Sequence, residues 1–144
     1  MKATDLALSR LLGIAAAPAG AEHLLEMPFV PALHNHLRTV HAGAQFTLAE
    51  AASAECLQRH FGTAAGEVFA VVRAVEVRYR KPATGTLLAF GRPDESTRLH
   101  LLDELTTRGR ATAVILIDLK DRPGTLVFHG KFDWFISRVP PPPA

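Results

Sequence analysis

The order of secondary-structure signals is the feature that most constrains this fold, because one long helical segment stands among several strand segments. Residues 43–61 are rich in alanine, and Phe46, Ala49 and Ser53 recur at the spacing of one helix face. Gly62 follows at the position where helices commonly end. We therefore predict a single long helix that begins at the start of this segment.

The segments that follow predict an antiparallel sheet. Apolar and polar side chains alternate over residues 67–81 and, most clearly, over residues 125–137. Residues 86–91 and 111–119 are further strand segments, and turn residues 121–124 separate the last two strands. Antiparallel strands with one helix packed on a single face define an α+β domain.

Two shorter helices are also predicted. The first covers residues 4–13, with Thr4 as its N-cap and Gly13 at its end. The second is capped by Asp94 and closed by Gly109. Their apolar residues are Leu6, Leu11 and Leu12 in the first helix, and Leu99, Leu102 and Leu105 in the second.

The chain divides into three parts by composition. Residues 1–21 are expected to form the N-terminal helix and a loop rich in alanine, proline and glycine. Residues 22–137 form the main domain, which opens with a strand within residues 22–31. Residues 138–144 read as a proline-rich, flexible tail.

Composition excludes several classes of function. With 144 residues, 48% of them hydrophobic, the chain fits one globular domain. Its net charge is only +2 and it has no run of Lys and Arg, so binding to nucleic acid is not indicated. Its apolar segments are too short to span a bilayer, and Asp5 and Arg10 interrupt the one that resembles a signal peptide. Cys56 is the only cysteine, so no internal disulfide forms, which fits the reducing cytoplasm.

Glu50 is the residue whose chemistry most needs an explanation. It stands among Ala49, Ala51, Ala52 and Ala54, and a carboxylate in such apolar surroundings is costly to bury unless it is paired or used. One interpretation is a helix carboxylate that reaches solvent or an arginine. The other is a partly desolvated carboxylate with a raised pKa, which can act as a general base near neutral pH.

The segment His41-Ala42-Gly43 stands where the long helix begins. The first backbone N–H groups of a helix have no intrahelical partner, and the helix dipole favours negative charge there. Such amides can hold the charge that develops on a carbonyl under attack. The alternative is an ordinary helix start whose amides are satisfied by Thr39 or by solvent.

Other polar residues have less specific patterns. His34, His36 and His41 lack the second ligand cluster that a metal site requires, so no metal is predicted. Cys56 is expected to be a small core residue rather than a nucleophile.

Arg78, Arg80 and Lys81 form a compact basic end of one predicted strand. They are either an ordinary solvated face or a site that attracts a phosphorylated ligand.

The segment from Asn35 to Glu50 resembles the signature of hotdog-fold acyl-CoA thioesterases of the phenylacetate-pathway, PaaI-like type. That signature begins with Asn, which is followed six residues later by His-Gly-Gly or His-Ala-Gly. An Asp or Glu then stands nine residues after the His. Asn35, His41 and Glu50 match this spacing. Residues 75–83 and 130–136 are similar to two later strands of the same family.

This resemblance implies a hotdog fold, in which a curved antiparallel β-sheet wraps around one long central α-helix. It also implies homodimers or dimers of dimers, with active sites at the dimer interface. The implied substrate is an acyl-CoA, and no cofactor is expected because coenzyme A is part of the substrate.

The same resemblance assigns roles to individual residues. Glu50 is the catalytic carboxylate, as general base or nucleophile, and Asn35 orients the water or the thioester. The backbone N–H of Ala42 or Gly43, which follow His41 in the motif, polarises the thioester carbonyl. Arg78, Arg80, Lys81 and Ser53 are the expected substrate contacts.

Three departures from the family pattern affect rate and substrate choice more than fold. Ala42 replaces the first glycine of the commoner motif, and Arg38 stands where relatives often have glycine. Ala54 stands where some members place a hydroxyl that holds the water, and Ser53 beside it lies at a different helical azimuth.

Two other functions remain open on sequence grounds. One is a non-catalytic acyl-CoA binding module, since a fold does not fix a function. The other is an acyl-thioester hydratase or dehydratase, although its usual His-Phe-Pro-Gly context is absent and Ala54 stands thirteen residues past His41. The acyl group is equally open among aromatic, short-chain and medium-chain acids.

Overall fold

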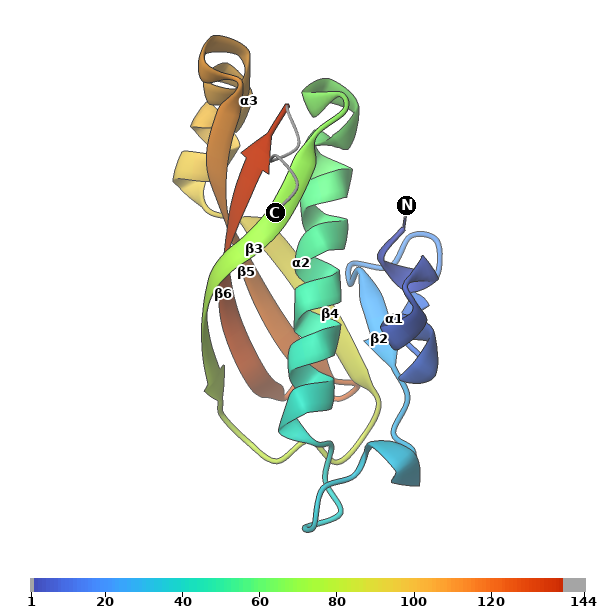
Figure 1. Cartoon of the computed structure of the whole chain (residues 1–144). Helices are drawn as coiled ribbons and strands as arrows, with labels where there is room; N and C mark the ends of the chain where they lie inside the picture. The colour runs from blue at the N-terminus through green and yellow to red at the C-terminus, as the bar shows by residue number, and fades with distance from the viewer. Residues whose placement is uncertain (1, 139–144) are drawn as a thin grey trace, which may run out of the picture.

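The computed structural model describes residues 2–138, which form one six-stranded antiparallel sheet curved around a long helix (Figure 1). The strands lie in the order β1-β2-β4-β5-β6-β3. This arrangement confirms the predicted α+β hotdog fold. The strands are β1 (Ala15–Ala16), β2 (Leu25–Met27), β3 (Phe69–Tyr79), β4 (Leu87–Pro93), β5 (Arg110–Asp121) and β6 (Leu126–Ser137). The helices are η1 (Ala3–Asp5), α1 (Ala7–Leu11), η2 (Pro31–Leu33), α2 (Ala42–Ala65) and α3 (Glu95–Arg108).

Helix α2 packs closely on the concave face of the sheet because small residues meet there. Ala49, Ala52 and Cys56 on the helix are fully buried. On β4, a Cβ added at Gly91 would lie only 3.2 Å from the Cβ of Cys56. Larger side chains at these positions would push the helix away from the sheet.

The C-terminal end of α2 differs from the prediction. The sequence places the end at Gly62, but the helix continues to Ala65. It stops at Gly66, whose φ of 69° is the left-handed backbone that favours glycine. A glycine inside a helix is tolerated at about 1 kcal/mol when neighbouring turns are well packed.

The long strands β3 and β6 follow the predicted alternation. On β6, Phe128, Phe132 and Ile136 are buried on the helix-facing side. Strand β3 pairs with β6 on one side only, so its other edge has no partner strand among residues 2–138. A bulge at Arg73 shifts the register of this edge strand.

Helix α3 begins and ends as predicted but buries a different face. The Asp94 side chain accepts a hydrogen bond from the Thr97 amide at 2.8 Å, and Gly109 ends the helix with a φ of 68°. Leu101 and Leu105 are buried, together with Thr97. Of the apolar residues named for this helix, Leu105 is buried, whereas Leu99 and Leu102 are 56% and 38% exposed.

The N-terminal segment is not the single helix predicted over residues 4–13. Leu6 is extended, with ψ of 139°, and separates η1 from α1. No side chain caps α1, so the predicted role of Thr4 is wrong. Leu11 is 79% exposed, whereas Leu12 is partly buried against the core.

The strand predicted within residues 22–31 is shorter than expected. β2 spans only three residues and ends before Pro28, which cannot donate to a sheet ladder. It pairs with β4 and with the two-residue strand β1, which lies in a segment predicted to be a loop.

The predicted tail lies outside the described residues except for Arg138. The Arg138 amide donates to the Gly109 carbonyl at 2.9 Å, and its Nε donates to the Leu105 carbonyl at 3.1 Å. Within residues 2–138, no helix has the length and apolar character needed to cross a membrane.

The close contact between α2 and the sheet leads to a stability prediction. Ala52→Leu adds volume where the side chain is fully buried, and we expect it to lower the free energy of unfolding by about 1–3 kcal/mol in urea denaturation. Ala64→Leu is the matched control, because Ala64 is exposed on the same helix and should tolerate leucine. Equal effects of the two substitutions would contradict the packing described here.

Candidate active site

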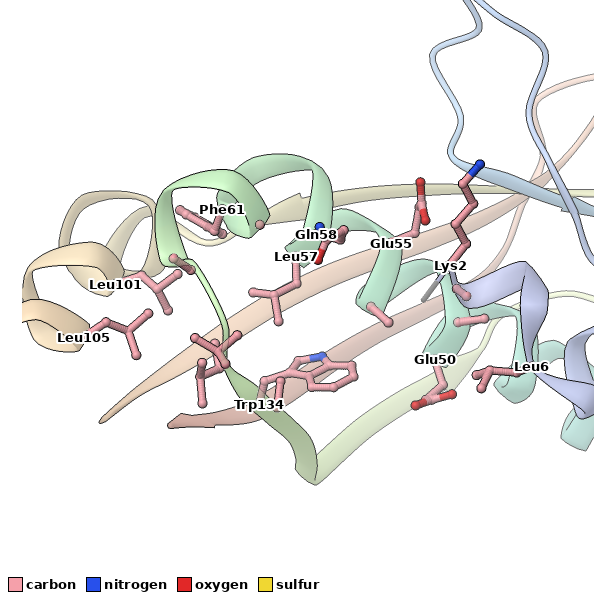
Figure 2. Close-up of a pocket in the computed structure, with 18 residues that line it drawn as sticks. Lys2, Leu6, Glu50, Glu55, Leu57, Gln58, Phe61, Leu101, Leu105 and Trp134 are labelled. Atoms are coloured by element: carbon pink, nitrogen blue, oxygen red, sulfur yellow. The ribbon is translucent and has the colours of Figure 1, made fainter. Parts of the chain in front are cut away.

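Glu50 lies on the wall of an apolar cleft of about 380 Å³. The cleft is lined by α2, the N-terminal segment, β3, β6 and α3, and Figure 2 shows the Glu50 carboxylate between Trp134 and Leu6. The side chain is half-buried, and within residues 2–138 its carboxylate has no hydrogen bond or ion pair. Burial raises the pKa of Glu50 above its ordinary value.

Ser53 fixes the position of the aromatic ring beside Glu50. Its hydroxyl donates to the Glu50 carbonyl at 2.7 Å and accepts from Nε1 of Trp134 at 3.1 Å. Ser53 is fully buried and does not line the cleft, and its predicted contact with substrate stays a prediction. Its hydroxyl points to the sheet and positions Trp134, which does line the cleft.

The N-terminus of α2 is exposed and only partly free. Nδ1 of His41 accepts a hydrogen bond from the Gly43 amide at 2.9 Å, so His41 is the N-cap of the helix. In this structure the Gly43 amide is therefore occupied by His41, and its contact with substrate stays a prediction. The Ala42 amide, in contrast, has no hydrogen-bond partner in the described part of the chain.

Asn35 organises the loop that leads to this helix. Its Oδ1 accepts from the amides of Leu37 at 2.9 Å and Thr39 at 3.1 Å, and its Nδ2 donates to Oγ1 of Thr39 at 2.9 Å. These bonds hold the Asn35 amide within the loop, and its predicted contact with water or thioester stays a prediction. Arg38 adopts a φ of 60°, a left-handed backbone conformation that is strained for a side chain other than glycine.

The carboxylate and the free amide are separated along one helix. Ala42 and Glu50 are eight residues apart, which corresponds to about 12 Å of α-helix. This distance is too long for both groups to act on one thioester within a single chain. The start of α2 lies instead near the sheet edge, because the Tyr79 hydroxyl at the end of β3 donates to the Ala42 carbonyl at 3.2 Å.

The other candidate residues have structural surroundings. Among residues 2–138, no three His, Cys, Asp or Glu side chains are grouped to hold a metal ion. The ring of His34 packs against Phe29 at 4.3 Å, and His36 is exposed. Cys56 is buried, as predicted for a core residue, and burial raises the pKa of its thiol to about 12.

The three basic residues stay close together at the end of β3. Arg78, Arg80 and Lys81 are all exposed. Arg78 makes one exposed ion pair, at 3.7 Å to Glu76. This geometry leaves them free to meet a solvent-borne anion, and their contact with substrate stays a prediction.

The apolar end of the cleft was not predicted from the sequence. It is made by Leu57 and Phe61 of α2, Leu101 and Leu105 of α3, and Trp134 of β6 (Figure 2). The spacing of Glu50, Leu57 and Phe61 was a signal for the α2 wall, since these positions follow one helix face. The contribution of α3 had no such signal, because it depends on how the strands place this helix.

Comparisons with known proteins agree with the fold. Residues 18–136 match the family described as a domain of unknown function, DUF4442, and the chain belongs to this family. Its fold is the hotdog fold of the thioesterase superfamily. No curated protein matches the chain.

Three solved structures illustrate the likeness. A Pseudomonas aeruginosa protein of unknown function, described as a probable thioesterase, is 26% identical with a TM-score of 0.77, over 92% of this chain and 88% of that chain. A Bacillus halodurans protein solved with CoA is 23% identical with a TM-score of 0.66, and the match covers 90% of this chain and 74% of that chain. A Haemophilus influenzae thioesterase is 17% identical with a TM-score of 0.67, and the match covers 95% of this chain and 87% of that chain. The PaaI-like type in particular stays a prediction.

The raised pKa of Glu50 predicts a pH-dependent effect on stability. Between the ordinary value of 4.5 and the folded-state pKa, the native state binds more protons than the unfolded state. The free energy of unfolding therefore falls as the pH rises through this window. Glu50→Gln removes the titrating group. The free energy of unfolding of this variant, relative to that of the wild type, should therefore increase as the pH rises through this window and should not change with pH below it.

Urea denaturation at a series of pH values measures this difference. Glu55→Gln, five residues along α2, is the control, because Glu55 is paired with Arg59 at 2.8 Å and its removal should bring no gain. A stability difference between Glu50→Gln and wild type that is the same at every pH would contradict the desolvation of Glu50.

Proposed function

We propose that this protein hydrolyses an acyl-CoA thioester to a free acid and CoA, with Glu50 as the general base. One observation carries the proposal: a half-buried carboxylate without a protein partner faces an apolar cleft. The likeness to thioesterases and to a CoA-containing structure of the same fold supports the choice of substrate.

The reaction follows from the chemistry of this carboxylate. Glu50 takes a proton from a water molecule while the water oxygen attacks the thioester carbonyl carbon. The carbonyl oxygen becomes an oxyanion, which a backbone amide stabilises. When the intermediate collapses, the C–S bond breaks and the proton on Glu50 passes to the CoA sulfur. The products are the acid and the CoA thiol, and no cofactor takes part.

The amide that holds the oxyanion comes from a second copy of the chain. Ala42 of the same chain is about 12 Å away along α2, whereas the unpaired edge of β3 offers a surface where another copy can add its own β3. The start of α2 lies close to that edge, as the bond between Tyr79 and Ala42 shows. A two-fold dimer with a joined sheet therefore brings each Ala42 amide toward the partner's cleft.

Other residues have supporting roles in this proposal. Arg78, Arg80 and Lys81 lie exposed at the same edge, where they can meet the phosphates of CoA. Asn35 and His41 are positioning residues, since their side chains shape the loop and the first turn of α2.

A second candidate is a protein that binds acyl-CoA without cleaving it. The observation that favours it is the amide group of Asn35, whose hydrogen bonds are made within the loop rather than toward a substrate. Tight binding of acyl-CoA with no release of free thiol from any thioester would favour this candidate.

Glu50→Gln tests the proposed base. We expect the turnover number to fall by at least about 100-fold on every thioester that the wild type accepts, because the general base is lost while shape is kept. Release of free CoA thiol is the measurement, and Glu95→Gln on exposed α3 is the control. Unchanged turnover in a folded Glu50→Gln protein would exclude Glu50 as the base.

Ala42→Pro tests the oxyanion donor and the shared site. Proline is tolerated at the first position of a helix and removes only the N–H, and His41 already has the extended backbone that precedes proline. We expect a loss of about 100-fold to 1,000-fold in turnover.

Mixing the two inactive variants distinguishes a shared site from a single-chain site. After subunit exchange, each mixed dimer of Glu50→Gln and Ala42→Pro contains one site with neither change. Random pairing then restores about a quarter of the sites. Exchange verified by mass without any recovery of activity would contradict a site built from two chains.

A further inference from the structure

The cleft at Glu50 is a channel with a polar end and an apolar end. The charged residues that line it, Lys2, Glu50 and Glu55, gather at one end (Figure 2). At the other end α3 supplies Leu101 and Leu105, which line the channel and are 1% and 0% exposed. A ligand in this channel therefore meets a carboxylate first and apolar side chains farther in.

The channel runs along one face of α2. Glu50, Ala54, Leu57, Phe61 and Ala65 line it at intervals of three or four residues. From Glu50 to Phe61 is eleven residues, or about 16 Å of helix. An extended carbon chain covers about 3.6 Å with three bonds, so about thirteen bonds fit this length.

The middle of the channel is shaped by Trp134. Its ring lines the channel between Glu50 and Leu57, and its Nε1 is held by the buried hydroxyl of Ser53. Since the polar atom of the indole is already paired with Ser53 of α2, the ring offers only apolar surface to a ligand.

We propose that the acyl group of the substrate is an unbranched aliphatic chain of about ten to fourteen carbons, which lies along this channel and ends at Leu101 and Leu105. This inference rests on the proposed function and specifies its substrate class. A short or single-ring acyl group leaves the α3 end of the channel unfilled. Each further methylene that is buried should strengthen binding by about fourfold until the chain reaches α3.

Binding of the free acid tests the channel without any hydrolysis. Trp134 is the only tryptophan of the chain, so its fluorescence reports on the channel alone. We expect sodium dodecanoate to shift the emission and to bind far more tightly than hexanoate, while acetate has no effect. Equal affinities for hexanoate and dodecanoate, or no response at all because a second copy fills the channel, would overturn the proposal.

Substitutions that block the channel at different depths test the direction of the chain. Ala65→Phe fills the α3 end and should lower kcat/KM for dodecanoyl-CoA more than tenfold relative to butanoyl-CoA. Ala54→Phe, one turn from Glu50, should lower kcat/KM for both. The smaller change Ala65→Leu serves if the buried Ala65 position does not tolerate phenylalanine, and its loss should again be confined to dodecanoyl-CoA. Ala64→Phe is the matched control, since Ala64 is exposed and does not line the channel.

These measurements separate the two proposals. If the wild type cleaves thioesters but its kcat/KM does not rise with chain length, the substrate class is wrong and the hydrolase stands. If dodecanoate binds but no thioester is cleaved, the channel stands and the hydrolase is wrong. A damaged fold lowers activity at every chain length, so a loss confined to long chains with Ala65→Phe is the supporting result.

Discussion

The fold depends on the close approach of one helix to the concave face of one sheet. Ala49, Ala52 and Cys56 are small enough for α2 to lie against β4 at Gly91, and this contact fixes the helix in the curve of the sheet. Because one face of α2 is buried in this way, the residues at other azimuths face the cleft and the sheet edge. The position of Glu50 is therefore set by the packing of its neighbours.

The same contact explains why Glu50 has unusual chemistry. The carboxylate is carried by a helix whose sheet-facing side is dry, beside an indole that Ser53 holds in place. Its surroundings remove water without supplying a charge partner, so the protonated form is favoured and the pKa rises. A group of this kind destabilises the fold slightly above its pKa, and such a burden is common at catalytic sites.

The sequence predicted the helices and strands well where the pattern of apolar and polar residues was strong and involved only residues close together in the chain. The alternation in β6, the capping of α3 by Asp94 and the core position of Cys56 are all confirmed. Features that depend on contacts between distant elements were not predicted. The hydroxyl of Ser53 pairs with a tryptophan on β6, and the faces of α3 follow from its place beside β5. Likewise, the Gly43 amide is occupied because of the side-chain rotamer of His41 rather than a pattern of residue types.

A crystal structure with an inert ketone analogue of dodecanoyl-CoA would place the reacting carbonyl relative to Glu50 and Ala42, since a methylene between sulfur and carbonyl prevents cleavage. We expect the ketone carbon beside the Glu50 carboxylate, with room for one water, and the ketone oxygen about 3 Å from the Ala42 amide of a second copy. Binding of the analogue with its carbonyl remote from Glu50, or with both groups supplied by one chain, would show that Glu50 and the Ala42 amide of a second copy do not form one active site.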